Sequence, residues 1–349
     1  MIFRDEAIER IRSGDAMRGV DLSDLDLSGA ELGGALLEST TLRGARLDGC
    51  DLRECTLVEC DLTGASLRGA RMDRSTVYRA RAAGVDLREA ALGVVRFVEC
   101  DLQGARFEGA DMLAMAVVES IASRASFAGA TMDRVALIGS EVDSLDLRGA
   151  RLRACVLSRT DLRTVQLDAA HLDLVVMMEC VLAGRDLRGV SFSACQLNGS
   201  DLRGADLRGA TLERCNFKDA TLIDARLGGA DLRGALLLGA RLMRADLARA
   251  DLRLALLLDA DLSLADVRGA NLEQAVLTRA RCVGTRFDGA NLTYADFTHA
   301  DVSGADFSGA TVLRARFHRA VDAGALGLGP GALGDDEALA SAEDFRSPY

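Results

Sequence analysis

Tryptophan is absent from this chain of 349 residues, and proline (2 residues) and histidine (3 residues) are rare. No run of about 20 apolar residues occurs, so we expect no membrane-spanning helix. Residues 1–7 are charged and lack the apolar stretch of a signal peptide. Because no linker-like stretch occurs before residue 321, we expect a single elongated domain.

A five-residue repeat dominates the chain: every fifth residue from Leu22 to Phe317 is apolar, and the phase never slips. We call the apolar position i. Position i−2 is usually small, i−1 is commonly Asp, Asn, Thr or Arg, and i+2 is often glycine. A period of five fits neither an α-helix nor a β-strand, so the pattern predicts one continuous repeat architecture. Glycines at i+2, such as Gly104, Gly149 and Gly204, indicate a turn with unusual φ.

The repeat resembles that of the pentapeptide-repeat family, whose consensus is A-(D/N)-L-X-X. Residues 230–234 read ADLRG and residues 270–274 read ANLEQ, which match the consensus almost exactly in its defined positions. The resemblance implies an all-β fold, a right-handed quadrilateral parallel β-helix in which four repeats form one coil. Positions i and i−2 would point inward, and the other three positions outward. Sixty repeats in phase would give about 15 coils.

The chain is expected to have three parts. Residues 1–19 form an N-terminal cap helix and lead-in, because residues 3–13 read as a short amphipathic helix that covers the first edge. Residues 20–320 form the β-helix, and residues 321–349 form an acidic C-terminal tail or cap. Phenylalanines twenty residues apart should stack on successive coils; these pairs are Phe107 with Phe127, Phe287 with Phe307, and Phe297 with Phe317.

Cysteine usage points to free thiols. Nine cysteines occur, an odd number, and none shows the spacing of a metal site. Cys282 replaces the residue at i, and the other eight replace the small residue at i−2, where cysteine acts as a small buried hydrophobe. We therefore predict free, buried cysteines and a reducing, cytoplasmic location. The eight are Cys50, Cys55, Cys60, Cys100, Cys155, Cys180, Cys195 and Cys215.

One of the four expected faces, that of Leu37, is unusually apolar at its outward positions i−1 and i+1. Contiguous exposed apolar surface often marks an interface, although β-propensity alone also places apolar residues on a sheet. We predict that this face binds a partner protein or a second copy of the chain, most simply as a dimer. The predicted interaction residues are Val58, Tyr78, Val98, Val118, Ile138, Val156, Val176, Met178, Leu236, Leu238, Leu256 and Leu258.

No nucleophile and base stand together in the repeat, so we predict no enzymatic activity, no cofactor and no metal site. His299 and His318 are expected on neighbouring coils near Asp296, but two histidines without a third ligand are weak evidence for a metal. Arg185 occupies an inward i−2 position, and we expect a local bulge that lets its guanidinium reach solvent, toward Asp186.

Two functional hypotheses follow. The first is a non-catalytic rigid scaffold for protein–protein interaction or self-association through the apolar face. The second rests on the resemblance, because some bacterial members of the family mimic B-form DNA and protect the type II topoisomerases DNA gyrase and topoisomerase IV. A DNA mimic needs a continuous negative field, whereas the net charge of −11 is spread over mixed faces and an acidic tail. The same mixed charge argues against direct binding of nucleic acid.

Overall fold

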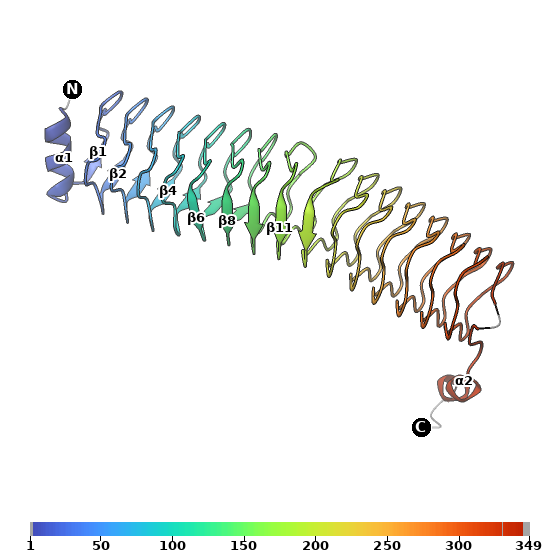
Figure 1. Ribbon diagram of the computed structural model, residues 1–349. Coiled ribbons are helices and arrows are strands. Elements are labelled where there is room, and N and C mark those ends of the chain that lie inside the picture. Colours follow the sequence, from blue (N-terminus) through green and yellow to red (C-terminus); the bar gives the residue numbers. More distant parts are fainter. Residues whose placement is uncertain (1–2, 330, 345–349) are drawn as a thin grey trace, which may run out of the picture. The chain divides into compact units, whose positions relative to one another are not determined.

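The computed structural model describes residues 3–329 and 331–344 and shows an all-β parallel β-solenoid with two short helices (Figure 1). The chain divides into two compact units, Met1–Val181 and Leu182–Tyr349, and each is described by itself. Neither helix in the described part of the chain is long and apolar enough to cross a membrane.

The first unit begins with helix α1 (Arg4–Arg12) and continues in short strands. The second unit contains one strand of three residues and helix α2 (Glu337–Asp344), and its coils are joined mainly by single β-bridges. The strands are β1 (Met17–Arg18), β2 (Leu36–Glu38), β3 (Thr56–Val58), β4 (Thr76–Tyr78), β5 (Arg96–Val98), β6 (Asp111–Leu113), β7 (Ala116–Val118), β8 (Thr131–Asp133), β9 (Ala136–Ile138), β10 (Arg151–Arg153), β11 (His171–Asp173) and, in the second unit, β12 (Ser191–Ser193).

Parallel pairing at an offset of twenty residues holds each unit together. In the first unit, β1, β2, β3, β4, β5, β7 and β9 follow one another in a single sheet, where Leu37 pairs with Leu57 and Leu57 with Val77. Strands β6, β8, β10 and β11 form a second sheet with the same offset. In the second unit the same offset links Asp206 to Arg226. Backbone N–H and C=O groups are thereby paired from coil to coil.

The interior is filled by positions i and i−2, as the family resemblance implied; Leu207 and Ala205, for example, are both 0% exposed. The predicted phenylalanine pairs are confirmed. The rings of Phe107 and Phe127 stack with centroids 4.4 Å apart, and the other two predicted pairs stack at 4.9 Å and 4.8 Å. All nine cysteines are free and buried, also as predicted.

The turn position i+2 adopts a positive φ at glycine and at many other residue types. Gly104 and Gly204 have φ of 67° and 64°, which is the role predicted for glycine there. Leu254 and Leu264 take φ of 60° and 61° at the same position. Left-handed backbone is unfavourable for residues with a Cβ, so the pairing and packing of the coil must impose this turn on them.

Helix α1 packs against the first coil through one apolar side. Ala7 and Ile11 are buried at 0% and 6% exposure, and Ile8 is buried as well. The Arg4 Nε donates a hydrogen bond to the backbone oxygen of Asp26 at 3.0 Å. A helix that covers the first edge in this way shields strand groups that would otherwise be open to pairing.

The bulge expected at Arg185 is absent. Its backbone N–H donates to the oxygen of Leu182 at 3.2 Å, and its own oxygen accepts from Asp206 N–H at 2.7 Å, as in ordinary repeats. Its side chain is half-buried. The carboxylate of Asp186 accepts a hydrogen bond from Arg188, with Nε to Oδ1 at 2.9 Å. The backbone therefore keeps its regular hydrogen bonds to Leu182 and Asp206 although a long cation stands at i−2.

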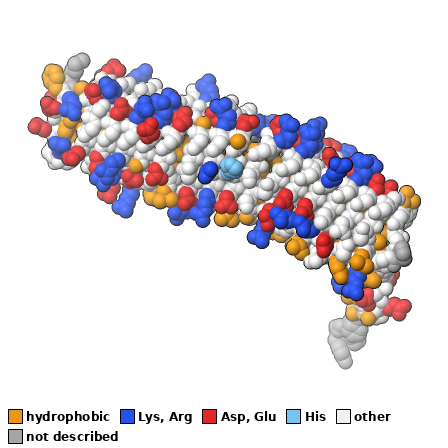
Figure 2. Space-filling model, viewed as in Figure 1, with side chains coloured by type: hydrophobic (Ala, Val, Ile, Leu, Met, Phe, Trp, Pro, Cys, Tyr) orange, Lys and Arg blue, Asp and Glu red, His pale blue; other side chains and the backbone are white. Residues whose placement is uncertain are grey.

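Asp at i−1 and Arg at i+1 of the same repeat form a recurring unit that we call the Asp–Arg clamp. In the clamp at Asp251, Arg253 donates from its backbone N–H at 3.2 Å, from Nε at 2.9 Å and from Nη2 at 2.6 Å. Figure 2 shows acidic and basic side chains close together along the visible face. Further clamps join Asp51 to Arg53, Asp86 to Arg88, Asp146 to Arg148, Asp161 to Arg163, Asp186 to Arg188, Asp201 to Arg203, Asp206 to Arg208, Asp231 to Arg233, and Asp266 to Arg268.

The arginine of each clamp neutralises the negative charge of the aspartate at position i−1. Hydrogen bonds from the Arg53 side chain are the main cause that lowers the pKa of Asp51 from 3.8 to about 2. The pKa of Asp86 is lowered in the same way by Arg88. A bidentate guanidinium binds both oxygens of the carboxylate and cancels its charge at short range.

We predict that the Asp51 carboxyl group titrates near pH 2 in the folded protein, and that Arg53→Gln raises its pKa toward 3.8. Because the folded pKa lies below the unfolded one, the clamp stabilises the folded state above about pH 4 and loses this contribution as the pH falls through about 2. Carboxyl carbon chemical shifts followed by NMR measure the titration. Arg124→Gln, a charge change outside the clamp, should leave the Asp51 midpoint unchanged; an equal shift in both variants would contradict the clamp.

Candidate protein-interaction surface

Five of the predicted interaction residues form one continuous column on the seven-stranded sheet. Val58, Tyr78, Val98, Val118 and Ile138 each end a strand, namely β3, β4, β5, β7 and β9, and each pairs with the next in register. We call this column the apolar ladder. Side chains on neighbouring strands of a sheet stand about 4.8 Å apart, so the five side chains make a contiguous apolar strip.

The apolar ladder faces outward. In every one of its strands the middle residue is buried while the flanking residues are half-buried or exposed. Ile138 is 47% exposed, and the other four ladder residues are half-buried. The parallel column beside the ladder contains the small residues Ala116 and Ala136, which leave room for a partner's side chains, and also the exposed Arg96.

Tyr78 is held in a fixed position within the ladder. Its hydroxyl donates a hydrogen bond to Glu99 Oε1 at 3.2 Å. The guanidinium of Arg79 lies 4.8 Å from the centroid of the Tyr78 ring and also binds Glu99, with Nε to Oε2 at 2.7 Å. An aromatic side chain that is already ordered loses little entropy on binding, which suits it to anchor an interface.

The remaining predicted residues continue this face or form a second patch. In the first unit, Val156 and Val176 follow Ala136 through β-bridges, and Met178 is 41% exposed. In the second unit, the four predicted leucines are half-buried and clustered, with one bridge between Leu236 and Leu256; they are Leu236, Leu238, Leu256 and Leu258. The predicted face is thus represented by one apolar patch in each unit.

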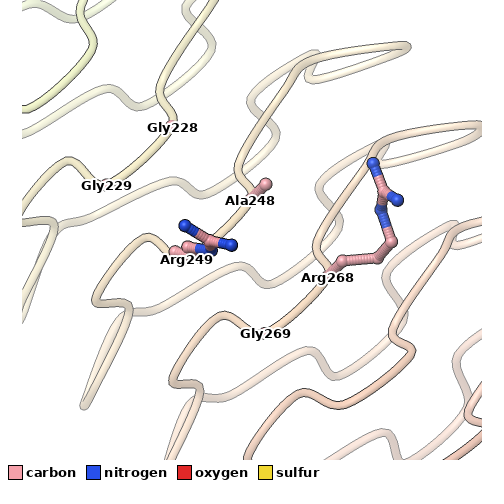
Figure 3. A pocket seen from close by; sticks show the side chains of 6 residues that line it. All are labelled: Gly228, Gly229, Ala248, Arg249, Arg268 and Gly269. Atoms are coloured by element: carbon pink, nitrogen blue, oxygen red, sulfur yellow. The ribbon is translucent and has the colours of Figure 1, made fainter.

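A surface hollow in the second unit arises where side chains are missing from successive coils. It is lined by Gly228, Gly229, Gly269 and Ala248, with the side chains of Arg249 and Arg268 beside it (Figure 3). Arg268 is engaged by the carboxylate of Asp266 through its clamp. Glycine and alanine supply no acid, base or nucleophile, so the hollow carries no catalytic set.

The histidines lie in a setting that the sequence did not reveal. The carboxylate of Asp296, which was expected near them, instead accepts hydrogen bonds from the backbone N–H of Thr298 at 3.0 Å and from the Thr298 hydroxyl at 2.6 Å. The side chain that does reach His299 and His318 is Glu343 of helix α2. Because Glu343 lies outside the repeat, no periodicity places it next to either histidine. His171 lies on β11 in the other unit.

Several solved structures resemble this chain, all at low TM-score. The fluoroquinolone resistance protein QnrB1 is 19% identical, with 52% of this chain and 89% of QnrB1 covered and a TM-score of 0.44. HetL, from the cyanobacterium Nostoc sp. strain PCC 7120 and involved in heterocyst differentiation regulation, is 23% identical, with 90% and 97% covered and a TM-score of 0.27. A protein of the Arabidopsis thaliana thylakoid lumen is 32% identical, with 34% and 68% covered and a TM-score of 0.17.

No curated protein matches the chain. The sequence pattern described as pentapeptide repeats matches stretches that together run over residues 17–112 and 176–321. These stretches cover more than half of the chain and coincide with coils whose bridges have the twenty-residue offset. The chain belongs to the pentapeptide-repeat family.

Proposed function

We propose that this protein is a non-catalytic scaffold that binds protein through the apolar ladder, and that a second copy of the chain is its partner in a dimer. The observation that carries the proposal is the run of five apolar residues in register on one sheet. Two such faces can meet around a twofold axis, because an isologous contact uses the same patch twice. A partner protein of another sequence is the alternative occupant.

The energetics favour burial of this face. Each apolar side chain that leaves water contributes about 25 cal/mol per Å² of buried area. The ladder residues are already partly ordered by their neighbours, so closing a second sheet over them costs little additional entropy. Packed sheets lie about 10 Å apart, a distance that valine and isoleucine side chains from two faces fill.

The finer architecture belongs to the same proposal. We propose about 15 coils, right-handed and four-sided, because four bridge positions recur within each twenty residues. Residues 1–19 would act as the N-terminal cap and lead-in, residues 20–320 as the β-helix, and residues 321–349 as an acidic C-terminal tail or cap. The nine free, buried cysteines support a reducing, cytoplasmic location.

The double substitution Val118→Glu and Ile138→Glu is expected to weaken dimerisation at least about tenfold, which is about 1.4 kcal/mol. The physical reason is that association would bury two carboxylates without partners. Sedimentation velocity across a concentration series measures the dissociation constant, and circular dichroism checks that the fold is retained. Leu238→Glu with Leu258→Glu tests the second patch in the same way.

Ile121→Glu is the matched control. Ile121 is 38% exposed and forms a β-bridge with Asp101, but it lies outside the apolar ladder. This substitution should leave association unchanged. Two results together would contradict the proposal: the wild-type protein stays monomeric at high concentration, and the ladder variant binds the same protein partners as the wild type. The ladder would then reflect β-propensity alone.

The net charge of −11 favours a second candidate, a DNA mimic that binds and protects DNA gyrase or topoisomerase IV. Against it stand the Asp–Arg clamps, which neutralise many outward carboxylates within their own repeats. B-form DNA carries two uncompensated phosphates per base pair. A surface of paired charges presents no comparable field to a DNA-binding protein.

We therefore predict little or no protection of topoisomerases. Gyrase supercoiling is measured with and without a fluoroquinolone while this protein is titrated in. We expect neither rescue nor inhibition at sub-micromolar protein. Rescue or inhibition in that range would reverse the ranking of the two candidate functions.

A further inference from the structure

The last coils of the second unit bring two imidazole rings together. His299 stands at the turn position i+2 of its repeat, and its backbone N–H donates a hydrogen bond to the backbone oxygen of His318 at 2.8 Å. The two ring centroids are 5.8 Å apart with the planes inclined at 68°. The coil-to-coil pairing that builds the solenoid thus sets the spacing between these side chains.

Helix α2 supplies a carboxylate to the same point. Glu343 Oε1 lies 3.1 Å from Nε2 of His299, and its Oε2 lies 3.4 Å from Nε2 of His318. The helix is anchored on both sides of this contact. Asp336 caps its first turn by accepting N–H groups of Ala338 and Leu339, each at 3.0 Å. Near its end, Arg319 binds Asp344 with Nη2 to Oδ2 at 2.5 Å.

We propose that His299, His318 and Glu343 form a binding site for a divalent transition metal of the zinc class, and that the ion ties helix α2 to the last coils. Two imidazole nitrogens and one carboxylate oxygen are a ligand set that Zn²⁺ accepts. Ligand bonds of about 2.0–2.2 Å in a tetrahedron separate neighbouring ligand atoms by about 3.3 Å. The separation of Glu343 Oε1 from His299 Nε2, 3.1 Å, is close to this value, whereas the atom 3.4 Å from His318 Nε2 is the other oxygen, Oε2. One ligand atom from each of the three residues lies within 4.8 Å of the other two, so a small movement of the side chains would bring them to the zinc spacing.

The site is closed on one side and open on the other. His318 is 3% exposed, whereas the side chains of His299 and Glu343 are 36% and 28% exposed. A metal ion can therefore reach the ligands from solvent, and a water molecule can complete its coordination. Sites with three protein ligands and an open fourth position are a common zinc arrangement.

Metal binding requires a change of tautomer at His318. Its Nδ1 accepts the N–H of Asp336 at 3.1 Å, so the neutral ring carries its proton on Nε2, facing Glu343. When Nε2 binds the ion it loses that proton, and Nδ1 takes one up in exchange with solvent. The hydrogen bond from Asp336 N–H to Nδ1 is then broken, because two donors would face each other, and the start of α2 must shift slightly. Asp335 Oδ1, which lies 3.6 Å from Nδ1, is then the acceptor. A carboxylate behind a metal-bound histidine is the usual second partner of such ligands.

One cation competes with the metal at Glu343. Arg319 Nε lies 3.4 Å from Glu343 Oε2. Arg319 also holds Asp344 and donates from Nη2 to the oxygen of Ala340 at 3.2 Å. It therefore keeps partners on α2 when the ion replaces it at Glu343. The ion would join residues 44 positions apart in the chain, and an ion that binds only the folded state adds its binding free energy to stability.

The test uses the full-length protein, purified without a polyhistidine tag and freed of metal by a chelator. Isothermal titration with ZnCl₂ should show one tight site per chain, and MgCl₂, a hard cation that prefers oxygen ligands, should show none. His299→Gln and Glu343→Gln should each weaken zinc binding at least about tenfold. His171→Gln, a change of the remaining histidine, should leave it unchanged. Circular dichroism checks the fold of each variant.

A second readout follows the ring nitrogens of the three histidines by ¹H–¹⁵N NMR. Zinc should move the His318 proton from Nε2 to Nδ1, and Asp335→Asn should weaken zinc binding without removing a ligand. Failure to bind zinc would overturn the proposal. Zinc binding that persists in both His299→Gln and Glu343→Gln would also overturn it, since the ion would then sit elsewhere, for example at cysteines. Neither result bears on dimerisation through the apolar ladder.

Discussion

The backbone pairing of each coil with the next, at an offset of twenty residues, is the constraint on which the rest of the structure depends. Because the offset is constant within each unit, any residue type that recurs every twenty positions becomes a column. Stacked phenylalanines are such a column inside the solenoid, as with Phe287 and Phe307, and the apolar ladder is one outside. A period in the sequence therefore becomes a column of side chains in the structure. The apolar ladder is one such column, and the cluster at Glu343 lies where the columns end.

Electrostatics on this surface is local. Where an arginine stands two residues after an aspartate at i−1, it binds that aspartate, so acidic and basic charges cancel within a single repeat, as at Asp231 and Arg233. The apolar ladder interrupts this pattern with side chains that gain from leaving water. The third feature, the cluster at Glu343, occurs only where the repeat ends and a helix folds back on the last coils. The surface therefore has three kinds of feature: the apolar ladder, the paired charges of the clamps, and the histidine–glutamate cluster where the repeat ends.

The sequence predicted what the repeat controls. The family resemblance implied the buried positions, and the unbroken phase then predicted the stacked rings at Phe107 and Phe127, the buried cysteines and the outward column from Val58 to Ile138. It failed where a residue breaks the pattern or lies outside it. At Arg185 the expected bulge is absent, because the backbone keeps its regular hydrogen bonds to Leu182 and Asp206. Glu343 was missed because tertiary docking of a non-repeat helix has no periodic signature.

Thiol titration tests the central claim, the inward placement of positions i and i−2, most directly. All nine cysteines occupy these positions and are buried, and burial raises the pKa of the Cys55, Cys100, Cys155 and Cys180 thiols to about 11. The thiolate is the reactive form, so a thiol reagent at mildly alkaline pH should label none of them in the folded protein and all nine after denaturation. A cysteine that reacts in the folded protein, or a disulfide in protein purified without oxidant, would contradict the account and identify the coil where the register is wrong.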